Sequence, residues 1–429
     1  MAFTDEWDAE LRSFTERLLS FDTTGGAEAP AQAWLADRLD EMGFETYEWT
    51  ADAGALAGHP SFPDDPGNAE AGADGPDLAD RPSVGGVLEF GDPDDGPTLV
   101  LNGHVDVVPV ARESWDTDPF DPAWDGDDLT ARGAADMKCG LAACVFAARH
   151  LADRADSLAL DGRLVVESVA GEEEGGIGAA AAALSNPYPF ERDAAVVAEP
   201  TDLSPVLATE GSVMKRLHLS GRSAHAATRW RGESVLPRFE RIRKAFRDLE
   251  AERSETVTHP LYEAFPVPWP VTVGTVEAGT WSSSVPATLA AEIRIGVAPG
   301  ETVDEVERAY ERRLAEVVAD DDWLGEHPPE FERFSIQFEP AEIAADEPVV
   351  EALQAAMTGH DLDTEPRGAT YGADSRHYVA AGIPTAVFGP GTIEQAHFPN
   401  ETVQWPDVLT AGAVLADTAR EFLGGPRTN

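Results

Sequence analysis

The chain has 429 residues, too many for one ordinary hydrophobic core, so two domains are expected. Its 42% hydrophobic and 8% aromatic residues are typical of a globular protein and exclude a disordered one. The 79 acidic and 31 basic residues give a formal charge of -48. This charge opposes binding to nucleic acid or anionic lipid, because such binding depends on cationic side chains. The acidic residues are spread along the whole chain, which favours adaptation to a very salty cytoplasm over an acidic interaction surface.

The N-terminal part of the sequence predicts two helices and a strand. The first residues, MAFTDEWDAELRSF, lack the basic and apolar regions of a secretory signal, and no apolar run is long enough for a membrane helix. These features predict a cytoplasmic protein. Apolar residues at helical spacing predict two helices before a strand near 44–49. Residues 51–83 are rich in Asp, Gly, Pro and Ala, and are expected to form a solvated loop with almost nothing to bury.

Strands and helices alternate after residue 98. The predicted elements are a strand at 98–109, a helix at 136–151, a strand at 163–170, a helix at 175–184 and a strand at 194–200. The alternation predicts an α/β fold with a mostly parallel sheet flanked by helices. Cys139 and Cys144 fall in one helix without a CxxC pattern, so we expect two buried free thiols.

The pattern changes at about residue 211. The order becomes β-α-β-β-α, with period-two alternation in the strands, which predicts a small α+β (ferredoxin-like) domain with helices on one sheet face. The α/β pattern resumes with a helix near 347–358, a strand at 383–391 and a helix at 402–423. We therefore expect a discontinuous larger domain of residues 1–209 and 337–429, with residues 210–336 inserted into it.

Several residues with metal-binding side chains follow predicted strands. His104 and Asp106 are one residue apart at a strand end and point to the same side, as suits a metal ligand beside an orienting acid. Asp136 stands at the start of a helix, where it could instead be an N-cap. GEEEGG at 171–176 follows a buried run of β-branched residues, and Glu199 ends another strand.

His397 lies in a loop after the strand at 383–391. Because ligands gather at the carboxyl edge of a parallel sheet, we expect all these side chains to converge there. Two imidazoles and several carboxylates suit Zn²⁺ or similar ions, with enough donors for two.

Six motifs in order make a resemblance specific. They are NGHVDVVP, ARGAADMKCG, GEEEGG, AEPT, GRSAHA and AHFPNE. Their order and spacing resemble the co-catalytic di-zinc aminoacylase/carboxypeptidase family, which includes acetylornithine deacetylase, succinyl-diaminopimelate desuccinylase and carboxypeptidase G. The similarity covers nearly the whole chain outside residues 51–83. It implies a zinc aminopeptidase-like catalytic domain and a lid or dimerisation domain at 210–336, and thus a homodimer.

The resemblance also assigns the metal ligands. By it, His104 and Glu173 are terminal ligands on different ions, Asp136 bridges the two ions, and Glu199 and His397 complete the set. The ions implied are two divalent metals, Zn²⁺ first, with Co²⁺ or Mn²⁺ as alternatives.

Further residues carry catalytic roles by resemblance. Asp106 is similar to the partner that orients His104, and Glu172 to the general base, which leaves Glu174 as a spectator. His225 in GRSAHA resembles the oxyanion donor that reaches a neighbouring subunit's site. A metal-bridged water would attack the amide of an N-acyl amino acid, and Glu172 would pass the proton to the leaving amine. A dipeptidase or carboxypeptidase on the same scaffold stays open, as does a non-catalytic metal-binding protein.

Some positions depart from the family pattern. Cys139 replaces a common glycine, and Gly171 stands where the family has an acid. Ser283 lies in SSSVP where many relatives carry Asn-x-Val-Pro, so it could donate one hydrogen bond in place of that amide. Arg294 and Arg376 are candidates for binding a substrate carboxylate through a bidentate pair, with structural ion pairs as the alternative.

Overall fold

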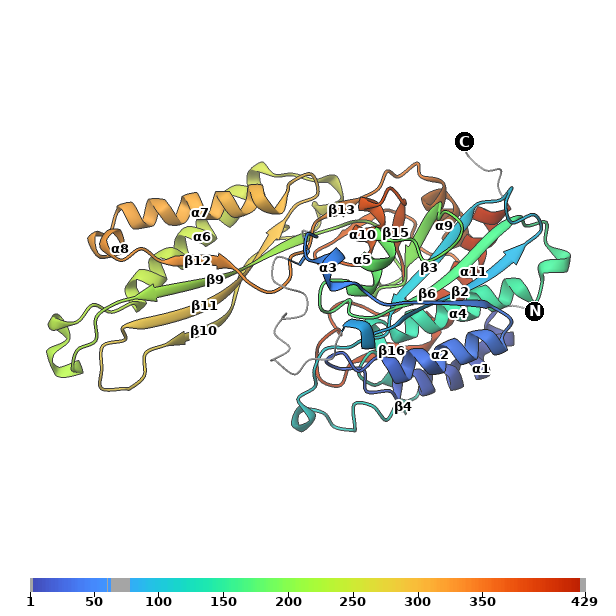
Figure 1. The fold of residues 1–429 in the computed structure, drawn as a ribbon, viewed down its shortest axis with the longest axis horizontal. Helices are drawn as coiled ribbons and strands as arrows, with labels where there is room; N and C mark the ends of the chain where they lie inside the picture. The colour runs from blue at the N-terminus through green and yellow to red at the C-terminus, as the bar shows by residue number, and fades with distance from the viewer. Residues whose placement is uncertain (1–2, 60, 63–77, 425–429) are drawn as a thin grey trace.

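The computed structural model describes residues 3–59, 61–62 and 78–424, which form a large and a small lobe (Figure 1). The chain builds most of the large lobe first, leaves it after strand β8 (Val206–Thr209), and returns to it at β13 (Ala341–Glu342). The sequence between these strands forms the small lobe. The boundaries predicted at 210 and 336 stay predictions. No helix of the described residues is long and apolar enough to cross a membrane.

The large lobe contains a sheet in the order β1-β2-β6-β3-β7-β15-β8-β13, with β14 beside β8. Its other strands are β1 (Glu45–Trp49), β2 (Ser83–Phe90), β3 (Thr98–His104), β6 (Gly162–Val169), β7 (Ala194–Val197), β14 (Arg367–Ala369) and β15 (Thr385–Val387). The central strands β6, β3, β7 and β15 run parallel, whereas β1, β2, β8 and β13 add antiparallel pairs outside them. The predicted α/β fold with a parallel sheet is confirmed at this centre.

Helices cover both faces of this sheet because its central strands are apolar on both sides. Leu99 and Leu101 of β3 join one core cluster, and Val100 between them joins another with Tyr378. The first face is covered by α1 (Phe3–Leu19), α2 (Ala29–Glu41), α4 (Cys139–Ala152), α9 (Pro348–Gly359) and α11 (Trp405–Leu423). The second is covered by α5 (Ile177–Leu184) and α10 (Ser375–Ala380). Both cysteines are buried and free in α4, as predicted.

The small lobe is a four-stranded antiparallel sheet in the order β10-β11-β9-β12. Its strands are β9 (Gly211–Ser220), β10 (Val271–Ala278), β11 (Thr288–Val297) and β12 (Glu330–Arg333). Helices α6 (Leu236–Thr256) and α7 (Val303–Ala319) pack together on one side of it, and the short α8 (Asp322–Glu326) follows α7 (Figure 1). This β-α-β-β-α-β arrangement confirms the ferredoxin-like expectation.

The expectation of a loop with almost nothing to bury is wrong for the described part of residues 51–83. Residues Ala53–Leu56 form α3, and Leu56 and Phe62 are buried in a cluster with Ile177 of α5. The Ser61 hydroxyl donates to Glu339 Oε2 at 2.7 Å. A few apolar side chains among many polar ones were enough to attach this segment to the large lobe. Residues 60 and 63–77 lie outside the described part.

A third, small sheet joins two distant segments of the chain. Strand β16 (Thr402–Gln404) pairs with β5 (Asp128–Thr130), which pairs with β4 (Ala123–Asp125). The sequence predicts a helix from residue 402, but α11 begins at Trp405. Residues 402–404 are extended because β5 gives them a partner from a part of the chain that helical periodicity cannot reveal.

Candidate metal centre

The carboxyl edge of the large sheet gathers the predicted ligand residues. His104 is the last residue of β3, and the turn at 171–176 follows β6. Glu199 comes two residues after the end of β7, and His397 lies in the loop after β15. Asp136 approaches from the turn Ala134–Lys138, immediately before α4. The structure thus brings together five segments that are distant in sequence.

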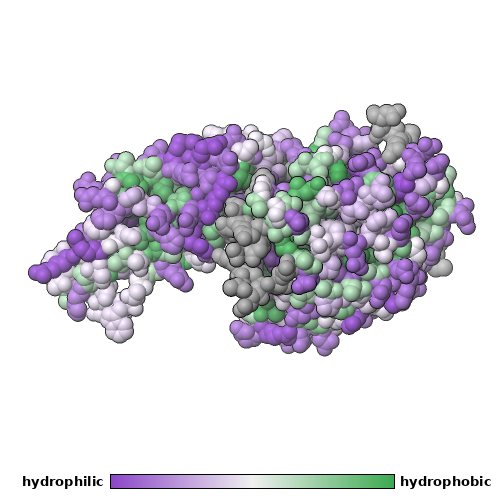
Figure 2. Space-filling model, viewed as in Figure 1, coloured by the Kyte–Doolittle hydropathy of each residue, from purple (hydrophilic) through white to green (hydrophobic). Residues whose placement is uncertain are grey.

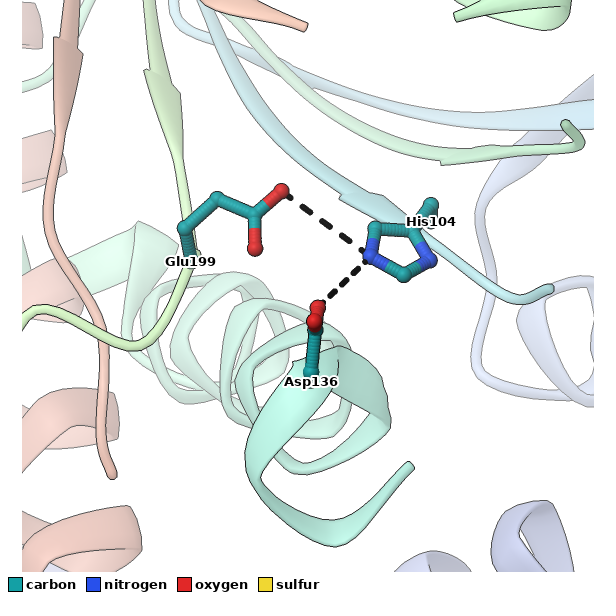
Figure 3. Close-up of side chains that lie close together, drawn as sticks. All are labelled: His104, Asp136 and Glu199. Carbon is teal, nitrogen blue, oxygen red and sulfur yellow. Dashed lines mark hydrogen bonds and ion pairs between the residues drawn. The ribbon is translucent and has the colours of Figure 1, made fainter. Parts of the chain in front are cut away.

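The first ligand group consists of His104, Asp136 and Glu199, whose side chains point toward one another in Figure 3. The His104 Nε2 atom lies 2.9 Å from Asp136 Oδ1 and 3.9 Å from Glu199 Oε1. All three side chains are buried. Their ligand atoms lie within 4.8 Å of one another, within the reach of one divalent ion.

The second group consists of Asp136, Glu173 and His397. The His397 Nε2 atom lies 3.5 Å from Asp136 Oδ2 and 3.1 Å from Glu173 Oε2. Unlike His104, the His397 side chain is 55% exposed. The second group is therefore the more open of the two.

Asp136 is shared by the two groups, with Oδ1 toward His104 and Oδ2 toward His397. Its backbone is non-helical, with φ -123° and ψ 95°, and its peptide bond to Met137 is cis. The residue at the N-cap of α4 is Lys138, and no side chain caps that end. The capping alternative for Asp136 is therefore wrong, because its carboxylate faces the two histidines.

The carboxylates raise the pKa values of both imidazoles in the metal-free protein. The hydrogen bond to Asp136, followed in size by the hydrogen bond to Glu173, raises the pKa of His397 to about 10. Burial opposes protonation of His104, but the hydrogen bond to Asp136 and the charge of Glu199 outweigh it and hold its pKa well above the usual value. Burial and the charge of Asp136 raise the pKa of Glu199. Positive charge is thus favoured at this cluster, as binding of divalent cations requires.

Asp106 positions both the ligand His104 and the turn at residues 171–176, which we call the glutamate turn. The His104 Nδ1 atom lies 2.9 Å from the backbone oxygen of Asp106 and donates to it, so Nε2 is left free for a metal. The Asp106 carboxylate lies 3.6 Å from the same Nδ1. Its oxygens accept from the backbone N–H groups of Gly171, Glu172 and Glu173 at 2.9, 3.1 and 3.0 Å. Asp106 therefore positions the turn as well as His104.

Glu172 belongs to neither ligand group. It is 7% exposed. Burial, and next the charge of Asp374, raise the pKa of Glu172 well above its usual value. A buried carboxyl that is close to the ligands but outside their groups is available to exchange a proton with a neighbouring water.

The glycines of GEEEGG let the turn close against α10. Gly171 and Gly176 have φ values of +75° and +76°, in the left-handed region that favours glycine. A Cβ on Gly176 would lie 2.4 Å from both Asp374 Oδ1 and His377 Nε2. The turn is also held from outside, because Arg81 Nη1 donates to Glu174 Oε2 at 2.6 Å. Glu174 thus anchors the turn, although we expected it from the sequence to be a spectator.

His225 and Ser283 lie away from this cluster. They belong to the loops that follow β9 and join β10 to β11, at the end of the small lobe farthest from the large lobe (Figure 1). The two loops are paired there, since the Ala226 N–H donates to the Ser283 carbonyl at 2.9 Å. Within one chain, neither residue is placed beside the ligand groups.

Arg294 and Arg376 have different surroundings. Arg294 extends from β11 toward the large lobe. It donates to Glu210 Oε1, between β8 and β9, at 3.2 Å and to the Thr370 carbonyl of the large lobe at 3.3 Å. Its side chain is 31% exposed. Arg376 is buried beneath the glutamate turn and donates to the carbonyls of Gly175 and Ala373 at 2.6 and 3.0 Å. Arg294 is open to a ligand, whereas Arg376 supports the turn.

Two buried acids of this region were not singled out from the sequence. Glu401 accepts hydrogen bonds from the segment that contains Asp136, and it belongs to the motif AHFPNE. Asp374 faces the glutamate turn from YGADSRHY, where burial raises its pKa to about 7. The available signal in both cases was an acid in a short motif that already held a candidate site residue, His397 for Glu401 and Arg376 for Asp374.

The donor set fits two divalent ions. Each group offers one imidazole nitrogen and carboxylate oxygens, which are ligands that Zn²⁺, Co²⁺ and Mn²⁺ accept. The shared Asp136 supplies one oxygen to each group. The class defined by this fold and these ligands is a metal-dependent hydrolase.

Comparison with known proteins gives the family. The chain belongs to Peptidase family M20/M25/M40, whose model matches residues 100–421. This match confirms the resemblance that the six motifs indicate.

Individual relatives cover most of the chain. A curated relative, N-formyl-4-amino-5-aminomethyl-2-methylpyrimidine deformylase of Halalkalibacterium halodurans, is 26% identical over 95% of this chain and 93% of its own. An acetylornithine deacetylase of Salmonella heidelberg is 28% identical over 76% of this chain and 80% of its own. The solved structure of a di-peptidase from Saccharomyces cerevisiae shares the fold, with a TM-score of 0.75 at 14% identity, over 99% of this chain and 98% of that one.

Proposed function

We propose that this protein hydrolyses the amide bond of an N-acyl amino acid or a related small amide, with two divalent ions, Zn²⁺ first, and Glu172 as general base. The observation that carries the proposal is the arrangement around Asp136. Its two oxygens face two separate His-carboxylate groups, while buried Glu172 lies outside both.

The chemistry divides between the ions and the chain. When bound, a pair of divalent ions supplies Lewis-acid activation of a water nucleophile and of the amide carbonyl. The proposed ligands are His104, Asp136, Glu173, Glu199 and His397. Glu172 accepts the proton of the attacking water and delivers it to the leaving amine. The Asp106 carboxylate holds three successive backbone N–H groups of the turn and so keeps the Glu172 side chain in place for this transfer.

Removal of a short acyl group is favoured over dipeptide cleavage by the relatives. The names deformylase and acetylornithine deacetylase both describe removal of a short acyl group. A dipeptidase or carboxypeptidase on the same scaffold is the alternative, in keeping with the shared fold of the di-peptidase. A non-catalytic metal-binding protein is a further alternative, which the complete ligand and base set disfavours.

Substrate binding is proposed for the junction of the lobes. Arg294 lies there and can offer its guanidinium to a substrate carboxylate. Thr370, whose carbonyl accepts from Arg294, lines a cavity of about 260 Å³ together with Pro200 and Tyr371. Pro200 directly follows the proposed ligand Glu199. Arg376 is buried and already donates to two backbone carbonyls, whereas Arg294 is partly exposed, so Arg294 is the better candidate.

A homodimer would bring His225 and Ser283 to a second chain's site. Both lie at the tip of the small lobe, so their proposed roles, as oxyanion and substrate hydrogen-bond donors, require a partner subunit. Strand β10 forms one edge of the four-stranded sheet of the small lobe. Beside it is a groove of about 400 Å³ lined by apolar side chains, such as Phe239 and Val276, and by Arg243 and Arg247. A free strand edge next to a partly apolar groove suits pairing with a second copy.

The acidic composition supports a very salty cytoplasm as the proposed location. Hydrophilic residues cover much of the viewed face of both lobes (Figure 2). At a charge of -48 per chain, association of two copies needs strong screening. The Debye length shrinks from about 10 Å at 0.1 M salt to about 3 Å at 1 M.

The proposal is tested by a substrate screen of zinc- or cobalt-loaded protein in concentrated KCl. N-formyl, N-acetyl and N-succinyl amino acids are compared with dipeptides. Hydrolysis of at least one acylated amino acid supports the proposal. Turnover of dipeptides alone would favour the peptidase alternative. Two bound ions without any hydrolysis would favour the non-catalytic one.

A further inference from the structure

A buried carboxylate, Glu401, connects two of the three segments that carry ligands of the second group, those of Asp136 and His397. It comes four residues after His397 in the sequence and is 0% exposed. The segment it contacts, residues 132–136, is more than 260 positions away in the chain and ends in the shared ligand Asp136. Glu401 itself belongs to neither ligand group.

Each oxygen of Glu401 accepts two hydrogen bonds from this segment. Oε1 accepts from the backbone N–H groups of Ala135 and Asp136 at 2.8 and 2.9 Å. Oε2 accepts from the Gly133 N–H at 3.0 Å and from Arg132 Nη1 at 2.7 Å. The carboxylate therefore fixes the backbone on the N-terminal side of Asp136, including that residue's own N–H.

Arg132 connects the same carboxylate to the His397 loop. Its side chain is 4% exposed, and its Nη2 donates to the His397 carbonyl at 3.5 Å. The three-stranded sheet of β4, β5 and β16 holds the bases of both loops, because Thr130 of β5 pairs with Thr402 of β16. The Ala131 N–H also donates to the Glu401 carbonyl at 3.1 Å.

A purely structural ion pair would explain less of this arrangement. Buried ion pairs add little net stability compared with apolar residues of similar size. Here three of the four bonds to the carboxylate come from backbone N–H groups of the turn that orients Asp136. Such bonds set the direction of a side chain that must serve two metal positions at once.

We propose that Glu401 is a positioning residue that holds Asp136 between the two metal positions, and that Arg132 extends this hold to the His397 loop. The inference rests on the metal centre of the proposed function. Since Asp136 is shared, disturbing Glu401 should weaken both positions together. Outer partners of metal ligands commonly change metal affinity by about 10–100-fold when they are replaced.

The test is Co²⁺ binding by metal-free Glu401→Gln, measured by calorimetry and by visible absorption of the bound ions. The amide nitrogen of Gln would face N–H donors, so at least one pair of bonds is lost. We expect affinity at both positions to fall by about 10–100-fold and the Co²⁺ spectrum to change. Glu421→Gln is the matched control, because Glu421 is exposed on the last helix and forms an ion pair with neighbouring Arg420. It should bind as the wild type does.

Unchanged affinities and spectrum in Glu401→Gln would overturn the inference, and so would a loss confined to one position. If Glu401→Gln does not fold, Arg132→Met decides, because it keeps the three backbone bonds. That variant should weaken the position served by His397 more than the other, and unchanged binding would overturn the inference. Failure of the wild type to bind Co²⁺ would instead contradict the proposed metal centre, and the inference with it.

Discussion

Asp136 has one carboxylate oxygen toward each of two histidines, and this arrangement gives the other acids of the site distinct roles. Glu173 and Glu199 complete the ligand groups, Asp106 and Glu401 hold backbone, and Glu172 is left outside. The roles of adjacent Glu172, Glu173 and Glu174 differ because each side chain leaves the turn toward a different neighbour. The role of each of these chemically identical side chains depends on its burial and its hydrogen-bond partners, which the sequence does not reveal.

At the residue scale, Glu172→Gln should lower kcat by about 10²–10⁴-fold while both metals stay bound, because only the proton carrier is removed. Glu421→Gln, at an exposed residue of the last helix that pairs with Arg420, is the control and should keep most of the turnover. Metal content and steady-state rates check both variants. Normal turnover by Glu172→Gln would show that another group is the base.

The same variant should affect stability in a predictable direction. Burial raises the pKa of Glu172 in the folded protein, so above the unfolded pKa the unfolded chain releases a proton that the metal-free folded protein keeps, and the fold loses stability. The destabilisation grows as pH rises toward the folded pKa. Thermal unfolding of metal-free Glu172→Gln at pH 8 should therefore occur at a higher Tm than that of the wild type.

Metal binding should depend on pH through His397. Its pKa of about 10 keeps the imidazole protonated at neutral pH in the metal-free protein, whereas a metal ligand must be neutral. Stabilisation of the metal-free fold by this charge is complete below about pH 6.5 and is lost as pH rises through about 10. Metal affinity should rise over the same window, by up to about tenfold per pH unit for each proton displaced.

Calorimetry in buffers of different ionisation enthalpy measures this proton release directly. We expect protons to be released on metal binding at pH 7.5. Affinity that does not change between pH 7 and 9 would contradict the protonated state of the histidines.

At the scale of elements, the site is built where strands end and turns begin. The sequence could predict this edge because β3, β6 and β7 are apolar runs that end in polar motifs. It could not predict β16, which is extended only because β5 pairs with it. Nor could it predict that Leu56 and Phe62 pack on α5, since two apolar side chains give no periodic signal.

At this scale we predict the effect of changing Asp106, whose carboxylate holds the glutamate turn. Asp106→Asn replaces one acceptor oxygen by an amide nitrogen that must face a backbone N–H of the turn. Leaving buried groups unsatisfied should cost about 1–3 kcal/mol in unfolding free energy and should also lower kcat. Urea unfolding and kinetics measure the two effects. Asp248→Asn, at an exposed residue paired with Lys244, is the control. Loss of stability without loss of kcat would show that Asp106 does not position the base.

At the scale of the whole molecule, a central parallel sheet and a separate ferredoxin-like sheet both follow from patterns that repeat over many residues. The position of the small lobe relative to the large lobe does not follow from such patterns, because it depends on a few contacts such as that of Arg294 with Thr370. Its tip, with His225 and Ser283, extends away from the large lobe (Figure 1). These residues can therefore act on substrate only at the site of a second chain.

Complementation tests this requirement. Glu172→Gln and His225→Ala should each be nearly inactive, with metal content intact. A mixed dimer would combine one intact Glu172 with an intact His225 of the partner subunit at a single site. Random mixing of equal amounts should restore about one quarter of the wild-type activity. No recovery in a mixture shown to exchange subunits would contradict action across subunits.

The central claim, that two divalent ions flank Asp136, is tested most directly by anomalous X-ray scattering from crystals of zinc-loaded protein at the zinc absorption edge. We predict two anomalous peaks per chain. One should lie among His104, Asp136 and Glu199, and the other among Asp136, Glu173 and His397. A single peak, or two peaks that do not share Asp136 as a ligand, would contradict the account.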